Sequence, residues 1–307
     1  MSEPEPMITE RMRALLGARA GLIDTPLALR NSPRTGDGLS LVGNSHEVRL
    51  SAVEQAAIVR DAWCCRMCGF VSKADQRAVA LNGNRRDIDQ TVTACDFCHQ
   101  CFHLEQVAAM GSGVLIWAPE VSQAELHHIA REVYVGRVIG GEAAETAKAC
   151  LEAILARRAG VRERIGSDDP AVLSARIQAS GGRLAAEDDL GGIRLFPLDR
   201  QLIRQGNRTI NLFPPMLGHW VWREGPYANA GLGSLAWLDY GSAVFGAEED
   251  KPAEAQQRNQ NGVESRIGSQ ETTDNGDAQP EFIFRRYDGE RFKYQILKLN
   301  RQSGEYD

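Results

Sequence analysis

The sequence lacks a long apolar segment and an export signal. Its longest strongly apolar run covers residues 114–118, whereas a helix that crosses a membrane needs roughly 18 to 20 apolar residues. The chain begins Met-Ser-Glu-Pro-Glu-Pro, which is acidic and proline-rich where a signal peptide is basic and then apolar. We therefore expect a soluble, cytoplasmic protein that is not inserted directly into a membrane.

The sequence also lacks an excess of basic residues. Lys and Arg number 35 and Asp and Glu number 41, which gives a formal net charge of -6. Residues 248–281 carry nine acidic and three basic side chains, so this segment accounts for the net charge and the rest of the chain is neutral. A protein that binds nucleic acid over much of its surface needs the opposite charge. Nucleic acid is therefore not the expected partner.

Familiar catalytic motifs are missing too. His127-His128 has no Glu after the first His, so it is not the HExxH motif of zinc proteases, and we predict that the pair lies on a helix surface. Gly111-Ser-Gly113 lacks the third glycine and the lysine of a phosphate-binding loop. The aromatic residues of 191–245 come with prolines and without interleaved bases, which favours a packed core over a base-stacking surface.

Cysteines are the strongest positive signal. Six of the seven lie within residues 64–101, and in a chain without an export signal such a cluster indicates metal binding rather than disulfides. Two CxxC motifs in this cluster are separated by 26 residues. Two such motifs supply the four thiolates of a tetrahedral zinc site. We predict one structural Zn²⁺ ion bound by Cys65, Cys68, Cys95 and Cys98.

The ligand set has alternatives, because neighbouring side chains also carry ligand atoms. These side chains are Cys64, His99, Cys101 and His103. In the simplest arrangement Cys64 and Cys101 are small buried side chains, which is the usual role of a spare reduced cysteine. Cys150 lies in a predicted helix, and we expect it to pack in the core.

Local signals predict a mainly helical middle of the chain. Ser51 with Glu54 forms a capping box that predicts a helix over residues 51–63, and Ser122 with Glu125 opens a second helix in the same way. The other predicted elements are a short helix at residues 8–17, a buried strand at 113–118, a helix at 142–158 closed by Ala159-Gly160, and a helix that begins at Asp169-Pro170.

The last third of the chain changes character. Residues 191–245 combine apolar runs, prolines and tryptophans, which predicts short strands, proline corners and an aromatic core. Residues 246–281 have few large apolar side chains and cannot offset the entropy of ordering, so we predict a disordered acidic linker. Two β-patterned runs joined by Asp288-Gly289 then predict a hairpin, which should dock on the body or on a partner because a lone hairpin is only marginally stable.

These elements predict an α+β protein with a zinc module embedded in a mainly helical domain. We divide the chain into an N-terminal segment (residues 1–50), the zinc module (51–110), the helical and aromatic remainder of the same body (111–245), the acidic linker (246–281) and the C-terminal hairpin (282–307).

The cysteine segment resembles the zinc-stapled HNH nucleases in motif order and length, and this resemblance implies an HNH-like treble-clef fold for the zinc module. A CxxC-Gly motif is followed by a strand, an Asn-Gly-Asn turn with Asp, and a second CxxC that runs into His. The catalytic His pair of that family corresponds to Ala80 and Leu81, neither of which can bind a proton or a cation. Only His99 remains, and one imidazole cannot both hold Mg²⁺ and activate water. The resemblance therefore implies a nuclease-like scaffold without catalysis.

Residues 50–240 together resemble the DotN/IcmJ family of type IVB secretion and related conjugation systems. The resemblance combines three features. They are the two CxxC motifs, near Trp63 and Cys95, without the catalytic His pair between them; the helical middle; and the segments Leu195-Phe-Pro-Leu and Asn211-Leu-Phe-Pro-Pro-Met-Leu. It implies a non-catalytic adaptor bound to the C-terminal extension of a membrane-anchored, DotL-like coupling ATPase, and so held at the inner face of the inner membrane. It identifies no partner-contacting residues.

Two alternative functions remain open from the sequence. A metal-dependent endonuclease would need Asp87 or Asp89 to act with His99, although we expect both aspartates to be solvated turn residues. A nucleic-acid-binding zinc protein would use Arg85-Arg86, against the neutral charge of the body.

Overall fold

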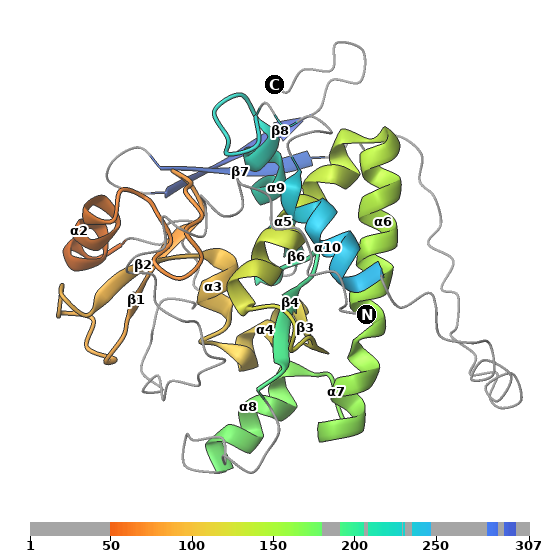
Figure 1. Ribbon diagram of the computed structural model, residues 1–307. Helices are drawn as coiled ribbons and strands as arrows, with labels where there is room; N and C mark the ends of the chain where they lie inside the picture. Colours follow the sequence, from red (N-terminus) through yellow and green to blue (C-terminus); the bar gives the residue numbers. More distant parts are fainter. Residues whose placement is uncertain are drawn as a thin grey trace, which may run out of the picture.

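Helices and small antiparallel sheets make an α+β architecture, as predicted (Figure 1). The computed structural model describes residues 50–179, 191–205, 208–228, 230, 235–246, 281–287 and 292–298. The predicted helix at residues 8–17 and residues 247–280 of the predicted linker lie outside these. The helices are α2 (Ala52–Arg60), α3 (Asp96–Gln100), α4 (Leu104–Met110), α5 (Gln123–Ile139), α6 (Gly141–Ala156), α7 (Arg158–Ile165), α8 (Pro170–Ala179), α9 (Phe213–Val221) and α10 (Ala236–Gly246).

Each strand pairs with one antiparallel neighbour. The strands are β1 (Gln76–Ala80) with β2 (Thr91–Cys95), β3 (Gly113–Trp117) with β4 (Ile193–Pro197), β5 (Leu202–Gln205) with β6 (Arg208–Asn211), and β7 (Glu281–Tyr287) with β8 (Phe292–Lys298). The strand predicted at residues 113–118 is confirmed as β3. Among the described residues, every helix is too short or too polar to cross a membrane.

Helix α2 and the β1–β2 hairpin form one end of the molecule (Figure 1). The predicted capping box is confirmed: the Glu54 N–H donates to Ser51 Oγ at 3.2 Å, and the Ser51 N–H donates to Glu54 Oε2 at 2.7 Å. The helix ends at Arg60 rather than at the predicted residue 63, because Ala62 and Trp63 adopt left-handed φ angles of 50° and 60°. This reversal turns the chain into the first CxxC motif.

Helix α5 is the centre of the fold. It begins at the second predicted capping box, which is confirmed, and it packs against α6, α9, α10 and β4 (Figure 1). The larger apolar core surrounds α5 and includes the four predicted cysteine ligands. A smaller core lies between α4, α7, α8 and the β3–β4 pair. Cys150 of α6 is buried in the larger core, as predicted.

Two further features differ from the sequence predictions. Ala159-Gly160 does not close a helix, because the chain continues as α7 through residue 160. A Cβ atom at Gly160 would lie 2.9 Å from the Cβ of Trp117, so the absence of a side chain at this position lets Trp117 pack closely against α7. Pro214 and Pro215 form no corner but lie in the first turn of α9, where the missing N–H groups cost nothing because they have no intrahelical acceptor.

The aromatic core predicted for residues 191–245 is confirmed for most of its large side chains. Trp220 and Trp237 are both 2% exposed, whereas Trp222 is 44% exposed. The two strands of the predicted C-terminal hairpin also form, with Glu281 opposite Lys298 and Tyr287 opposite Phe292. Strand β7 lies beside α9 (Figure 1), so in this structure the hairpin docks on the protein's own body.

Packing around Trp117 gives a stability prediction with a neighbouring control. A Cβ atom at Gly192 would lie 2.7–2.8 Å from the Trp117 ring, whereas a Cβ at Gly191 meets nothing within 4 Å. Gly192→Ala should therefore lower the free energy of unfolding by about 1–3 kcal/mol through overpacking. Gly191→Ala should leave it nearly unchanged. Chemical denaturation of both variants checks this, and equal stability of the two would contradict the packing described here.

Candidate metal centre

The four predicted zinc ligands come together in the core. Their sulfur atoms all lie within 4.8 Å of one another, and all four side chains are buried. Cys68 Sγ and Cys95 Sγ are 3.6 Å apart, too far for a disulfide bond of about 2.05 Å. Four sulfurs at about 2.3 Å from one tetrahedral ion would be about 3.8 Å apart. The arrangement therefore fits a single metal ion.

Short turns aim the two cysteine pairs at one point. In the first motif the Gly69 N–H donates to the Cys65 carbonyl at 2.8 Å, and Gly69 has a φ of 76°, which favours glycine. In the second motif Cys95 ends β2 and caps α3, and the Cys98 N–H donates to Cys95 Sγ at 3.5 Å. Strand β2 and helix α3 thereby bring the second pair onto the first.

The prediction that His127-His128 lies on a helix surface is wrong. His127 is fully buried and His128 is 8% exposed. Helix α5 has no solvated face along this stretch, because the cysteine cluster, α6, α9 and α10 surround it. His128 Nε2 lies 2.7 Å from the Cys68 carbonyl oxygen, and its ring stacks on Trp237 with centroids 4.9 Å apart.

Arg131, one turn after His127, contacts the sulfur atoms directly. Its Nη2 donates to Cys95 Sγ at 2.7 Å and lies 3.8 Å from Cys68 Sγ. The guanidinium carbon lies 4.0 Å from the centroid of the Phe70 ring, a cation–π distance. Arg131 is not among the site residues predicted from the sequence. The sequence feature that could have identified it is the distribution of apolar residues around the whole of α5. A helix of this kind is buried on all sides, so its polar residues cannot face water.

His127 contacts the cluster through Nδ1, which lies 3.2 Å from Cys98 Sγ. Its other ring nitrogen, Nε2, lies 2.9 Å from Gln123 Nε2. The Leu195 N–H donates to Gln123 Oε1 at 2.9 Å, so the amide nitrogen of Gln123 is the atom that faces His127. An amide nitrogen can only donate, and therefore His127 Nε2 accepts and Nδ1 carries the proton. Burial and the nearby Arg131 lower the pKa of His127 to about 3, so the ring is neutral.

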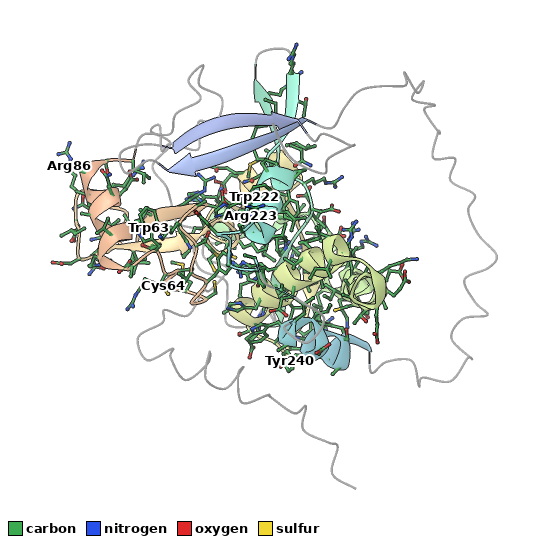
Figure 2. All side chains as sticks on the ribbon, turned by 90° about the horizontal axis from the view of Figure 1, so that it is seen from above. Trp63, Cys64, Arg86, Trp222, Arg223 and Tyr240 are labelled. Atoms are coloured by element: carbon green, nitrogen blue, oxygen red, sulfur yellow. The ribbon has the colours of Figure 1, made fainter. Side chains whose placement is uncertain are left out.

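The alternative ligands lie outside the four-sulfur cluster. Cys101 is buried, as predicted, with Sγ 3.8 Å from His127 Nε2. Cys64 is only partly buried, which contradicts the prediction that it is a core side chain. Figure 2 shows Cys64 beside Trp63 on the α2 side of the molecule. The ring of His99 lies against that of His103 in a tilted arrangement, with centroids 4.6 Å apart, and burial lowers the pKa of His99 well below its usual range.

The positions that match the HNH catalytic pair lie at the end of β1. Ala80 pairs with Thr91, and Leu81 packs on the larger core. Nearby, Arg77 Nε donates to Asp96 Oδ1 at 2.7 Å, and both side chains are buried. Asp96 Oδ2 accepts further bonds from the Gln100 and Gln201 side-chain amides. Arg77 and Asp96 are thus held in a hydrogen-bonded network between β1 and α3.

Both aspartates proposed for the nuclease alternative lie in the β1–β2 turn. Asp87 Oδ1 accepts from the Asp89 N–H at 3.1 Å, and the carboxylate of Asp87 also holds the Asn82 amide at 3.1 Å. Asp89 is exposed. Asp87 thus acts as an organiser of the turn.

Metal binding at this cluster should depend steeply on pH. Burial raises the pKa of the Cys95 and Cys98 thiols well above that of an exposed cysteine, so a metal ion must displace protons to bind thiolates. The affinity should therefore fall as pH falls, by about tenfold per pH unit for each proton displaced. Competition with a chelator of known proton affinity, between about pH 6 and pH 8, measures this. A pH-independent affinity would show that the thiols are ionised without metal.

Comparison with models of known protein families finds no match. The chain is 32% identical over 157 residues to the type 4 apparatus protein DotN of Legionella pneumophila subsp. pneumophila, strain Philadelphia 1. The aligned region covers 48% of this chain and 73% of DotN. Identity of this extent across most of DotN, together with the cysteine cluster described above, shows that the chain belongs to the DotN family.

Proposed function

We propose that the chain is a non-catalytic adaptor subunit of a type IVB secretion or conjugation coupling complex, stabilised by one structural zinc ion. In this role it binds the C-terminal extension of the coupling ATPase and helps to recruit substrates. The observation that carries the proposal is the match to DotN over 73% of its length, because DotN is described as a type 4 apparatus protein. The geometry of the cysteine cluster supports the structural role of the metal.

The chemistry of the four sulfur atoms favours zinc. Four thiolates in a tetrahedral arrangement are typical of structural Zn²⁺ sites, whereas catalytic zinc keeps one position open for water. All four cysteines here are buried, and four sulfurs complete the coordination shell. The ion would then join the two CxxC turns, and its binding energy would contribute directly to folding.

The residues at the nuclease-like positions support a non-catalytic role. Ala80 and Leu81 carry no group that can bind a proton or Mg²⁺, and His99 is buried against His103. Asp96, the carboxylate closest to His99 in sequence, pairs with Arg77. A replacement catalytic base would have to break this ion pair or come from the exposed β1–β2 turn.

In this proposal the protein reaches the inner face of the inner membrane by binding the ATPase partner.

The adaptor proposal predicts a specific partner. Full-length tagged protein, purified from detergent-solubilised inner membranes of its native host, should co-purify the coupling ATPase, identified by mass spectrometry. An untagged strain and an ATPase truncated before its C-terminal extension serve as controls. Recovery of the truncated ATPase at full yield would contradict the proposed binding segment.

The same preparation should not nick supercoiled plasmid in Mg²⁺ or Mn²⁺. Nicking that disappears in a His99→Ala variant, without a co-purified ATPase, would overturn the adaptor proposal in favour of the endonuclease. His99→Ala should otherwise be silent in the nicking assay.

Metal content gives a second prediction with an adjacent control. Cys98→Ser removes a proposed ligand, so the purified protein should hold less than one zinc ion per chain and should unfold at a lower temperature. Cys64→Ser changes the partly exposed cysteine beside the first motif and should keep the full zinc content. Elemental analysis and thermal unfolding of the two variants test this. Full zinc content in Cys98→Ser would exclude Cys98 as a ligand.

A further inference from the structure

A metal ion held by four cysteines creates a charge problem in this core. Four thiolates and one divalent cation carry a net charge of -2, and each of the four cysteines is at most 2% exposed. A net charge at such depth is costly unless an opposite charge or several hydrogen bonds compensate it. The residues that supply this compensation would therefore determine how tightly the ion is held.

Arg131 has the position and the charge to compensate the thiolates. It is 1% exposed, and its guanidinium donates to Cys95 Sγ, the His127 carbonyl and, at longer range, Cys68 Sγ. Among the described residues no carboxylate forms an ion pair with it, and the sulfurs of Cys95 and Cys68 lie 2.7 and 3.8 Å from its Nη2. A buried arginine without a carboxylate needs another anion, and the thiolates are the anions within reach.

His127 supplies a complementary hydrogen bond from the same helix face. Gln123 Nε2 lies against its Nε2, and the Gln123 amide is itself fixed at both ends by the backbone of Leu195. This chain of bonds holds the proton of His127 on Nδ1, 3.2 Å from Cys98 Sγ. An N–H donor toward a thiolate stabilises its negative charge. Residues 127 and 131 are one helical turn apart, so α5 presents both donors together.

We propose that α5 stabilises the metal centre from outside its ligand set: Arg131 neutralises one of the two negative charges, and His127 donates from Nδ1 to the Cys98 thiolate. The inference rests on the metal site proposed above. It makes α5 part of the centre, although all four ligands come from residues 65–98. Because Phe70, Phe97 and Trp220 surround the guanidinium at 4.0, 5.0 and 5.9 Å, Arg131 also connects the centre to α9.

An arginine with this role should affect the zinc-bound protein more strongly than the metal-free protein. Arg131→Met should weaken zinc affinity by about 10–100-fold, the usual effect of removing an outer-shell partner. A metal ion keeps all four sulfurs as thiolates, and without it fewer negative charges face Arg131, so the same substitution should lower the melting temperature of the metal-free protein less than that of the zinc-bound protein. A merely structural arginine would lower the melting temperature of both forms by the same amount.

Two matched variants complete the experiment. Arg131→Lys keeps the charge but not the guanidinium fork, so its affinity should lie between those of wild type and Arg131→Met. Arg137→Met removes an exposed arginine of the same helix, which pairs with Asp199, and should leave zinc affinity unchanged. Zinc affinity is measured by competition with a chelator on the full chain, and thermal unfolding is followed with and without metal.

The outcomes separate the inference from the proposed site. Wild-type protein that binds no zinc would overturn the metal site and, with it, the roles of Arg131 and His127. Wild-type protein that binds zinc, with Arg131→Met binding equally well, would overturn the role of Arg131 alone. If Arg131→Met does not fold, His127→Gln provides the test, because Gln cannot place its N–H at the Nδ1 position. It should bind zinc several-fold more weakly than His127→Asn, whose amide nitrogen can occupy that position, and equal binding of the two would refute the His127 contact.

Discussion

Four sulfur atoms that meet in a dry core are the constraint on which the rest of this structure depends. They come from two turns separated by the β1–β2 hairpin, so the register of that hairpin must place Cys95 against the first motif. The pairing of Gln76 with Cys95 at one end and of Ala80 with Thr91 at the other does this. The left-handed reversal at Ala62 and Trp63 then delivers the first motif from α2. The register of the hairpin and the reversal after α2 thus both serve to bring the four sulfurs together.

Helix α5 carries several buried polar contacts because it packs against several elements at once. Besides His127 and Arg131 at the cysteines, Glu132 accepts the backbone N–H groups of Trp237 and Leu238 at 2.7 and 3.1 Å and so caps α10. Tyr134 donates to the Pro197 carbonyl at 2.7 Å and fixes the end of β4. A buried polar group is favourable only if it is satisfied. These bonds therefore specify one position for α5 more sharply than apolar packing would.

The sequence predicts the features whose signal is local. Ser51 with Glu54 and Ser122 with Glu125 indicate helix starts because the capping bonds span only three residues, and CxxC spacing identifies cysteine pairs for the same reason. The strand at residues 113–118 could be predicted from its apolar run. Its partner β4 could not, because the pairing joins Gly113 to Pro197 and no short-range pattern specifies so distant a neighbour.

The predictions that were wrong have a common physical cause. In each case a contact with residues far away in the sequence overrides the structure that the local pattern favours. Glycine usually ends a helix, yet Gly160 lies inside α7 because Trp117 occupies the space of its missing side chain. Proline usually breaks a helix, yet Pro214 and Pro215 begin one. His127 and His128 have the sequence of a helix surface but lie in a core. In each case the partner is distant in sequence, and only the fold supplies it.

The contacts of α5 with the cysteine sulfurs bear on how this fold can serve an adaptor. If residues 51–110 held the metal alone, they would be a separable zinc module attached to a helical body. The contacts of Arg131 and His127 with the sulfurs argue against such a division, because both donors lie beyond residue 110. The aromatic side chains around Arg131 extend the same unit to α9 and, through β7, to the C-terminal hairpin. The surface that this continuous body presents to a partner therefore depends in part on the packing around the central cysteines.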